Sequence, residues 1–421
     1  MDLIRTNKKS RMAALLAPAF SVVLALFASA APAQALRSDS DLGAQWRINS
    51  TAKLLAGLAP MTPAHIEYAE TDAWKEHSAH MKAAWQKMNQ KQVAAMTSWR
   101  DSAVSKTCPV GKTVLYPFSG PDFFNAYWLF PDCETFVMFG LEHVGDIPDI
   151  ERMSEAQFVR MLADVRTATT DFFGRNYFIT ENMSRQLRTA QLRGVIPLFM
   201  IPMALSGVDI LRIRPFEFPA TLRTVATPRG RPMRQLQGIT IEFRAPGSPI
   251  TRRVHYFTVD VTDTGLSHYP EFLSYVRSLG PTTTFIKSAS YLLHSNEFRN
   301  IRSALLDVSG FLVQDDSGLP YPMLEARGWK MNLYGTYGVP IPPFQRAFQV
   351  SLDRAYKSQS TSPLPFSFGY QFHDHRDERS NVMVGPRPLQ AAFVEERSLN
   401  KAAPRAPKRS SSQRTAKKQV Y

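Results

Sequence analysis

The stretch from Thr113 to Glu142, TVLYPFSGPDFFNAYWLFPDCETFVMFGLE, carries the clearest signal of the fold class in this chain. It begins with a short apolar strand from Thr113 to Phe118, which the turn Ser119-Gly120-Pro121-Asp122 follows. A short helix from Phe123 to Phe130 and a second buried strand from Thr135 to Gly140 complete it. A strand, a helix and a strand in so short a stretch predict a βαβ unit with two parallel strands.

A second unit of the same kind follows later in the chain. Thr283 to Ala289 has the pattern of a strand, Glu297 to Leu306 that of a helix, and Phe311 to Val313 that of another strand. Further strands are expected at 329–334, 366–372 and 381–384, and antiparallel strands at 208–218, 238–244 and 252–261. We therefore expect an α/β fold. Its mainly parallel sheet is built from βαβ units with a helical and antiparallel insertion, and a long N-terminal helix precedes it.

We predict the helices mostly from the periodicity of apolar residues and from capping signals. Thr62-Pro63 has the pattern of a helix start, and apolar residues then recur on one helical face up to about Arg100. Such a stripe is typical of core, although it also fits a docking surface for a partner helix. A capping box at Ser154 and Gln157 opens another helix, and a second is expected from about Ser184 to Arg193. The residues of the N-terminal stripe are Trp74, Met81, Trp85, Met88, Met96 and Trp99.

The two cysteines of the chain, Cys108 and Cys133, each lie just before one strand of the first βαβ unit. Because parallel neighbours begin at the same edge of a sheet, the two thiols are expected to meet there. We predict a structural disulfide, which is typical of an oxidising compartment. A reactive or metal-binding pair is the alternative, but this edge lies opposite the usual ligand side of such sheets.

Residues 1–35 have the pattern of a bacterial secretory signal peptide. Four basic residues precede an apolar stretch from Met12 to Ala28, and Ala33-Gln34-Ala35 offers a cleavage site after Ala35. An uncleaved anchor helix is the alternative, which Pro18 inside the apolar stretch disfavours. We therefore expect an exported protein, located in the periplasm or outside the cell.

The charge of the chain lies mostly at its two ends. The net charge is +14, of which the signal peptide carries +3 and residues 401–421 carry +7, which leaves about +4 for residues 36–400. The end of the chain is rich in Ala, Pro, Ser, Lys and Arg, and we expect a disordered basic tail over 396–421. Such a tail fits an anionic envelope polymer or a membrane surface, or it has no partner at all. The nearly balanced remainder does not predict nucleic-acid binding.

These features divide the chain into four parts. A signal peptide (1–35) is followed by an N-terminal helical segment (36–105) and by an α/β domain (106–395) with its insertion at about 150–262. The basic tail (396–421) comes last.

Several familiar motifs are absent or incomplete. Gly111-Lys112-Thr113 lacks the preceding glycine of a phosphate-binding loop, and no Gly-x-Ser-x-Gly elbow occurs. The spacing from Gly120 to Glu142 is typical of dinucleotide folds, but most of the required glycines are missing. His373-Asp374-His375 favours a solvated loop over a metal site. The sequence therefore predicts no metal and leaves the cofactor unknown.

The candidate site comes from position instead. In open α/β sheets, ligands bind beyond the carboxyl ends of the strands, and four predicted strand ends carry polar residues. Paired carboxylates there can share a proton, and a lysine can activate a hydroxyl, although turn caps and ion pairs explain the same residues structurally. The catalytic candidates are Asp122, Glu142, Lys287, Ser290, Asp315 and Asp316. The ligand-binding candidates are Ser119, Gly120, Ser288 and Ser317.

Five runs in the sequence carry a resemblance: Tyr116–Asp122 (YPFSGPD), Phe139–Glu142 (FGLE), Ile286–Tyr291 (IKSASY), Gln314–Gly318 (QDDSG) and Gly335-Thr336-Tyr337. Together they resemble a family of uncharacterised exported bacterial proteins, over roughly residues 65–385. Because that family has no established activity, the resemblance implies no chemistry.

Two functions fit these expectations. The first is an exported envelope protein that binds a small molecule or a partner at a polar site along the strand ends. The alternative is a periplasmic hydrolase or transferase that uses the clustered carboxylates with Lys287 or a serine. Geometry separates the two, because an enzyme needs these groups open to a cleft, whereas buried and mutually bonded groups are structural.

Overall fold

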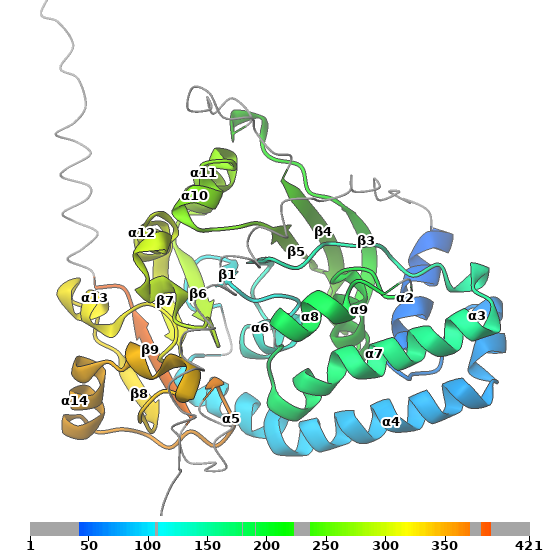
Figure 1. The fold of residues 1–421 in the computed structure, drawn as a ribbon, viewed down its shortest axis with the longest axis horizontal. Coiled ribbons are helices and arrows are strands. Elements are labelled where there is room, and N and C mark those ends of the chain that lie inside the picture. The colour runs from blue at the N-terminus through cyan, green and yellow to red at the C-terminus, as the bar shows by residue number, and fades with distance from the viewer. Residues whose placement is uncertain are drawn as a thin grey trace, which may run out of the picture.

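The structure is a computed structural model, shown in Figure 1. The predicted signal peptide, the predicted basic tail and His373–His375 lie outside the residues it describes. Those residues are 42–105, 108–178, 180–189, 191–222, 236–370 and 380–388.

A nine-stranded mixed sheet forms the centre of the molecule, in the order β3-β4-β5-β2-β1-β6-β7-β9-β8. The five middle strands are parallel, and the two strands at each side are antiparallel, so the fold is α/β as predicted. The parallel strands are β5 (Thr251–Thr258), β2 (Thr135–Gly140), β1 (Thr113–Pro117), β6 (Thr282–Ile286) and β7 (Ser309–Gln314). The flanking strands are β3 (Asp209–Pro215), β4 (Gln237–Arg244), β8 (Asn332–Gly335) and β9 (Asn381–Pro386).

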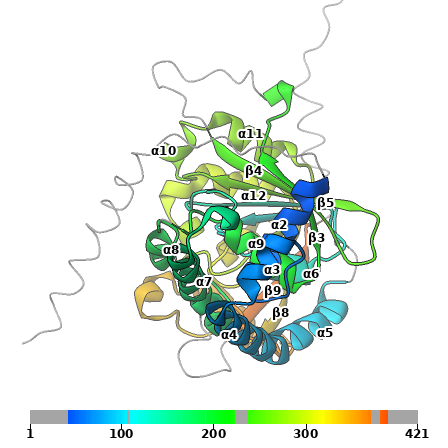
Figure 2. The same cartoon turned by 90° about the vertical axis from the view of Figure 1, so that its right-hand side faces the viewer.

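Helices cover both faces of the sheet, because alternate side chains of each buried strand point to opposite sides (Figures 1 and 2). Tyr116 and Phe136 belong to one apolar cluster, whereas their neighbours Leu115 and Val137 belong to the other. The first cluster includes α2 (Leu42–Leu55), α4 (Asp72–Met88), α5 (Ala94–Ala103), α6 (Phe123–Leu129), α7 (Glu155–Arg175), α8 (Thr180–Gln186) and α9 (Ile196–Leu205). The second includes α10 (Asp263–Leu266), α11 (Pro270–Ser278), α12 (Arg299–Val308), α13 (Tyr321–Ala326) and α14 (Val350–Ser358).

The N-terminal stripe is core, as predicted. Apart from Trp85, which is only partly buried, its residues are buried in the first apolar cluster. The short helix α3 (Pro63–Ala69) begins at Pro63, and α4 follows it directly. A five-residue π-helix, Asn89–Val93, then connects α4 to α5, so the backbone is helical from Asp72 to Ala103.

Three sequence predictions differ from the structure. The strand expected at 252–261 pairs antiparallel with β4 but parallel with β2, so β5 belongs to the parallel set. The helix expected from about Ser184 is α8, which lies earlier in the chain. Residues 366–370 form no strand, because Ser367 bonds through its backbone to the side chain of Gln92 instead of to a neighbouring strand.

Cys108 and Cys133 form the predicted disulfide at the edge where β1 and β2 begin, with their Cα atoms 4.9 Å apart. The bridge closes a sequence separation of 25 residues around α6. It therefore fixes the first βαβ unit from the edge opposite the polar strand ends.

Replacing both cysteines by alanine is expected to lower the free energy of unfolding by about 3 kcal/mol, because the unfolded chain regains the entropy of an open loop. Urea unfolding of the oxidised protein and of the double variant measures this difference. Wild-type protein unfolded under reducing conditions is the control and should match the variant. Equal stability of the oxidised and reduced proteins would contradict a structural role.

Candidate functional site

The candidate site lies at the carboxyl edge of the parallel strands, where the strand order changes direction. From β1 the chain continues to β2 on one side, and later returns to β6 on the other side. Open α/β sheets bind their ligands at such a switch point. Asp122 follows β1 and Lys287 follows β6, so these two candidates flank the switch point directly.

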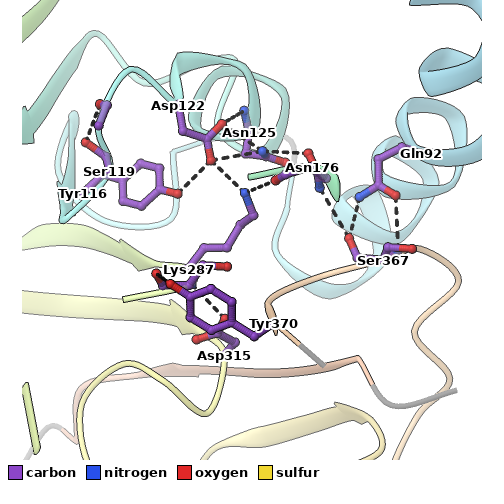
Figure 3. Close-up of polar contacts among 12 residues, drawn as sticks. Gln92, Tyr116, Ser119, Asp122, Asn125, Asn176, Lys287, Asp315, Ser367 and Tyr370 are labelled. Atoms are coloured by element: carbon purple, nitrogen blue, oxygen red, sulfur yellow. Dashed lines mark hydrogen bonds and ion pairs between the residues drawn. The ribbon is translucent and has the colours of Figure 1, made fainter. Parts of the chain in front are cut away.

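Asp122 and Lys287 form a buried ion pair across this point (Figure 3). The Lys287 Nζ lies 2.8 Å from Asp122 Oδ2, and both residues are 2% exposed. The Tyr116 hydroxyl donates to the same oxygen at 2.8 Å. Asp122 is also the N-cap of α6, where its Oδ1 accepts from the backbone and side chain of Asn125. One carboxylate therefore fixes a helix start, a tyrosine and a lysine.

Two residues that the sequence analysis did not identify complete this centre. Lys287 also donates to the carbonyl of Asn176, which ends α7 in a left-handed conformation and bonds Asn125 through its side chain. The Asn176 amide and the Gln92 amide both donate to the Ser367 carbonyl, and Gln92 also accepts from the Ser367 N–H (Figure 3). An Asn after a predicted helix is a recognisable C-cap signal. Gln92 lies in the π-helix and offers no signal in the sequence.

Asp315 and Asp316, which follow β7, are buried and have separate partners. Asp315 accepts from the Ser288 N–H at 2.8 Å, and its other oxygen accepts from the N–H and hydroxyl of Ser317. Asp316 accepts from the Tyr291 hydroxyl and from the Asn381 amide. Burial and the charge of Asp316 raise the pKa of Asp315 to about 7. The folded chain therefore favours the protonated form of this carboxyl more than an exposed aspartate does.

Ser288 and Ser290 lie in the loop after β6, under Tyr370. The Tyr370 hydroxyl donates to the Ser288 carbonyl at 2.6 Å and lies 2.7 Å from Ser290 Oγ. The Ser288 hydroxyl is buried and has no hydrogen-bond partner among the described residues. Lys287 bonds Asp122 and Asn176, and within the described ranges no bond joins it to either serine.

Ser119, Gly120 and Glu142 lie on the β2 side of the switch point. The Tyr256 hydroxyl lies 3.2 Å from Glu142 Oε2 and 3.0 Å from the Glu142 carbonyl. A side chain on Gly140 would clash with the Glu142 carboxylate, and one on Gly120 would lie 3.6 Å from it. The Ser119 hydroxyl donates to the Gly120 carbonyl. Glu142 therefore fills the space between two glycines at the ends of β1 and β2.

Unusual backbone conformations concentrate at this edge. Among the described residues, six that are not glycine have a positive φ, a conformation that costs about 1–3 kcal/mol each. Five of the six are at the site, and Ser105 is the exception. The five are Phe118, Asn176, Ser288, Ser290 and Tyr291.

The predicted residues thus converge on one edge, but they are mostly buried and bonded to one another. The Lys287 ammonium lies within reach of a carboxylate, as an enzyme would require, yet it is closed off from solvent. Within the described parts of the chain, no cluster of three histidine, cysteine or acidic side chains could hold a metal ion. No helix in those parts is long and apolar enough to cross a membrane.

Comparison with known proteins adds no relative to this picture. No family model, no curated protein and no solved structure matches the chain.

Proposed function

We propose that this chain is an exported protein of the bacterial envelope that binds a small polar ligand at its switch point, between the ends of β1 and β6. The export rests on the pattern of residues 1–35, and the disulfide between Cys108 and Cys133 agrees with an oxidising compartment. The resemblance to exported bacterial proteins in the YPFSGPD, FGLE, IKSASY and QDDSG runs belongs to the same proposal.

The proposal of a binding site rests on one observation: two features that do not favour stability occur together at this edge of the sheet. A buried ion pair rarely stabilises a protein more than apolar side chains of the same size. Left-handed conformations at residues other than glycine also lower stability. A scaffold has no need for both at a switch point, whereas functional sites commonly tolerate such features.

The chemistry of the lining favours a ligand with hydroxyl or amino groups, such as a sugar or an amino sugar. Four buried carboxylates, Asp122, Glu142, Asp315 and Asp316, follow the ends of the parallel strands, and the Lys287 ammonium group pairs with Asp122 alone among them. The Ser288 hydroxyl, which has no partner within the described ranges, and the Ser290 hydroxyl provide further polar contacts under Tyr370. In the proposed complex, a ligand hydroxyl takes the place of the Tyr370 hydroxyl on the Ser288 carbonyl.

A thermal-unfolding screen of sugars and amino sugars tests the proposal. A ligand present at a hundred times its dissociation constant should stabilise the wild type by about 2.7 kcal/mol. The Ser290→Ala variant should lose most of this stabilisation, since it lacks one ligand contact. The matched control is Ser278→Ala on α11, where the hydroxyl donates only within its own helix, and this variant should respond like the wild type. Equal responses of Ser290→Ala and the wild type would exclude this location.

A hydrolase or transferase is the second proposal. The raised pKa of Asp315 favours it, whereas the burial of Asp315 and Lys287 argues against it. A carboxyl group with a pKa of about 7 can act as a general acid near neutral pH. Turnover of chromogenic glycosides or esters by the wild type, lost in Asp315→Asn with the fold retained, would support this activity. If a ligand binds but is not turned over, the result would contradict the enzymatic function and support the binding function.

A further inference from the structure

A second polar surface lies on the antiparallel part of the sheet, away from the switch point. Arg212 on β3, Glu242 on β4 and Arg253 on β5 are direct neighbours across three adjacent strands. Arg214 lies two residues further along β3, on the same face. We call these three arginines around Glu242 the arginine face (strands labelled in Figure 2).

All three arginines of this face surround one carboxylate. Guanidinium nitrogens of Arg212, Arg214 and Arg253 lie 3.5, 3.3 and 3.6 Å from Glu242 oxygens. The Glu242 side chain is only 12% exposed, whereas the arginine side chains are 30–48% exposed. Glu242 therefore pairs with all three guanidinium groups but neutralises only one of their three charges. The face carries a net charge of +2, directed to solvent.

The geometry points to an acidic polysaccharide as the partner of the arginine face. Guanidinium groups bind carboxylates through paired hydrogen bonds, and here they come from β3 and β5, in a row of residues that Glu242 on β4 completes. Such an open row suits an extended anionic chain. The row also includes no exposed apolar side chain, since its neighbours Thr240 and His255 are polar, which disfavours insertion into a lipid surface.

This surface is separate from the proposed small-molecule site, and its test does not depend on that site. The probe is alginate, a linear polyuronate, as oligosaccharides of defined length. Calorimetry measures its binding to the full chain at several salt concentrations. The triple variant Arg212→Gln, Arg214→Gln, Arg253→Gln should bind about tenfold more weakly, with a smaller salt dependence. A charge-matched control, Lys75→Gln, Arg152→Gln, Lys357→Gln, removes three exposed cations elsewhere and should bind within about twofold of the wild type.

The Glu242→Gln variant keeps the test decisive if the triple variant does not fold. It leaves all three arginines and raises the net charge of the face to +3, so alginate should bind more tightly. Weaker binding by Glu242→Gln, or equal losses in the two triple variants, would overturn the proposal. Tighter binding of double-stranded DNA than of alginate at equal ionic strength would overturn the choice of partner.

Discussion

Lys287→Met is expected to lower the free energy of unfolding by about 3–5 kcal/mol. The substitution removes the ammonium group that pairs with Asp122 and leaves a buried carboxylate without its counter-charge. The Tyr116 hydroxyl and the Asn125 amide still donate to that carboxylate, but neither group carries a charge. Urea unfolding of the wild type and the variant measures the loss.

Two further variants separate the ion pair from simple loss of packing. Adding Asp122→Asn to Lys287→Met removes the unpaired charge and keeps an acceptor for the α6 cap, so the double variant should recover part of the stability. Lys112→Met is the matched control. The Lys112 Nζ lies 2.6 Å from Glu134 Oε1, but the Lys112 side chain is 73% exposed. Its removal should cost no more than about 1 kcal/mol. A loss of similar size for Lys112→Met and Lys287→Met would contradict the role assigned to burial.

Acidification from pH 6.5 to pH 4 is expected to destabilise the protein strongly. Burial lowers the pKa of His77, His255 and His294 to about 4, from 6.5 for an exposed imidazole. Between these two pKa values the unfolded chain binds more protons than the folded chain, so the free energy of unfolding falls as the pH falls. Each group contributes at most about 1.4 kcal/mol per pH unit, and the stability that it provides is complete above pH 6.5.

Asp315 has the opposite effect on stability over almost the same pH range. Its pKa is raised in the folded chain, so its contribution is complete below about pH 4 and is lost as the pH rises through 7. The three histidines outweigh this one carboxyl. Urea unfolding at several pH values measures the sum, and His77→Gln should flatten the curve, because an amide can replace the imidazole bond to the Leu55 carbonyl. Stability that stays constant or increases from pH 6.5 to pH 4 would contradict this account.

The parallel centre of the fold could be predicted because its signals are local. Thr113–Pro117 and Thr135–Gly140 are apolar runs on either side of a short helix, and the cysteines before them form the predicted disulfide. The pairing partner of β5 could not be predicted in the same way. Its alternating pattern indicates a hairpin with β4, which exists, but its parallel bonds to β2 join segments more than a hundred residues apart.

Residues 366–370 show how a strand pattern can mislead. Phe366 and Phe368 are buried at the two-residue period of a strand. Their backbone nevertheless bonds to side chains, since Ser367 pairs with Gln92 and the Phe368 N–H donates to Ser380 Oγ. Because side chains from distant segments replace the ladder partners, no local signal in the sequence distinguishes this segment from a strand.

The sequence predicted that the candidate residues share one edge of the sheet, which they do, but it did not predict that they are mostly buried. Asp122, Lys287 and Asp315 were predicted only from their positions after strands, and all three lie at one edge. Their burial depends on Asn176 and Tyr370, which reach the site from other parts of the chain. Position in the sequence therefore predicts which residues converge, whereas the tertiary structure decides whether they are open.

In the proposed complex a ligand replaces the Tyr370 hydroxyl at the switch point, and calorimetric titration of Tyr370→Phe beside the wild type measures this replacement. The titrant is the sugar or amino sugar that stabilises the wild type most in the thermal screen. Tyr370→Phe keeps the covering ring but frees the Ser288 carbonyl and the Ser290 hydroxyl, so it should bind this compound more tightly than the wild type does. Ser290→Ala should bind it more weakly. Equal affinities in all three proteins, or no binding by any of them, would contradict the account.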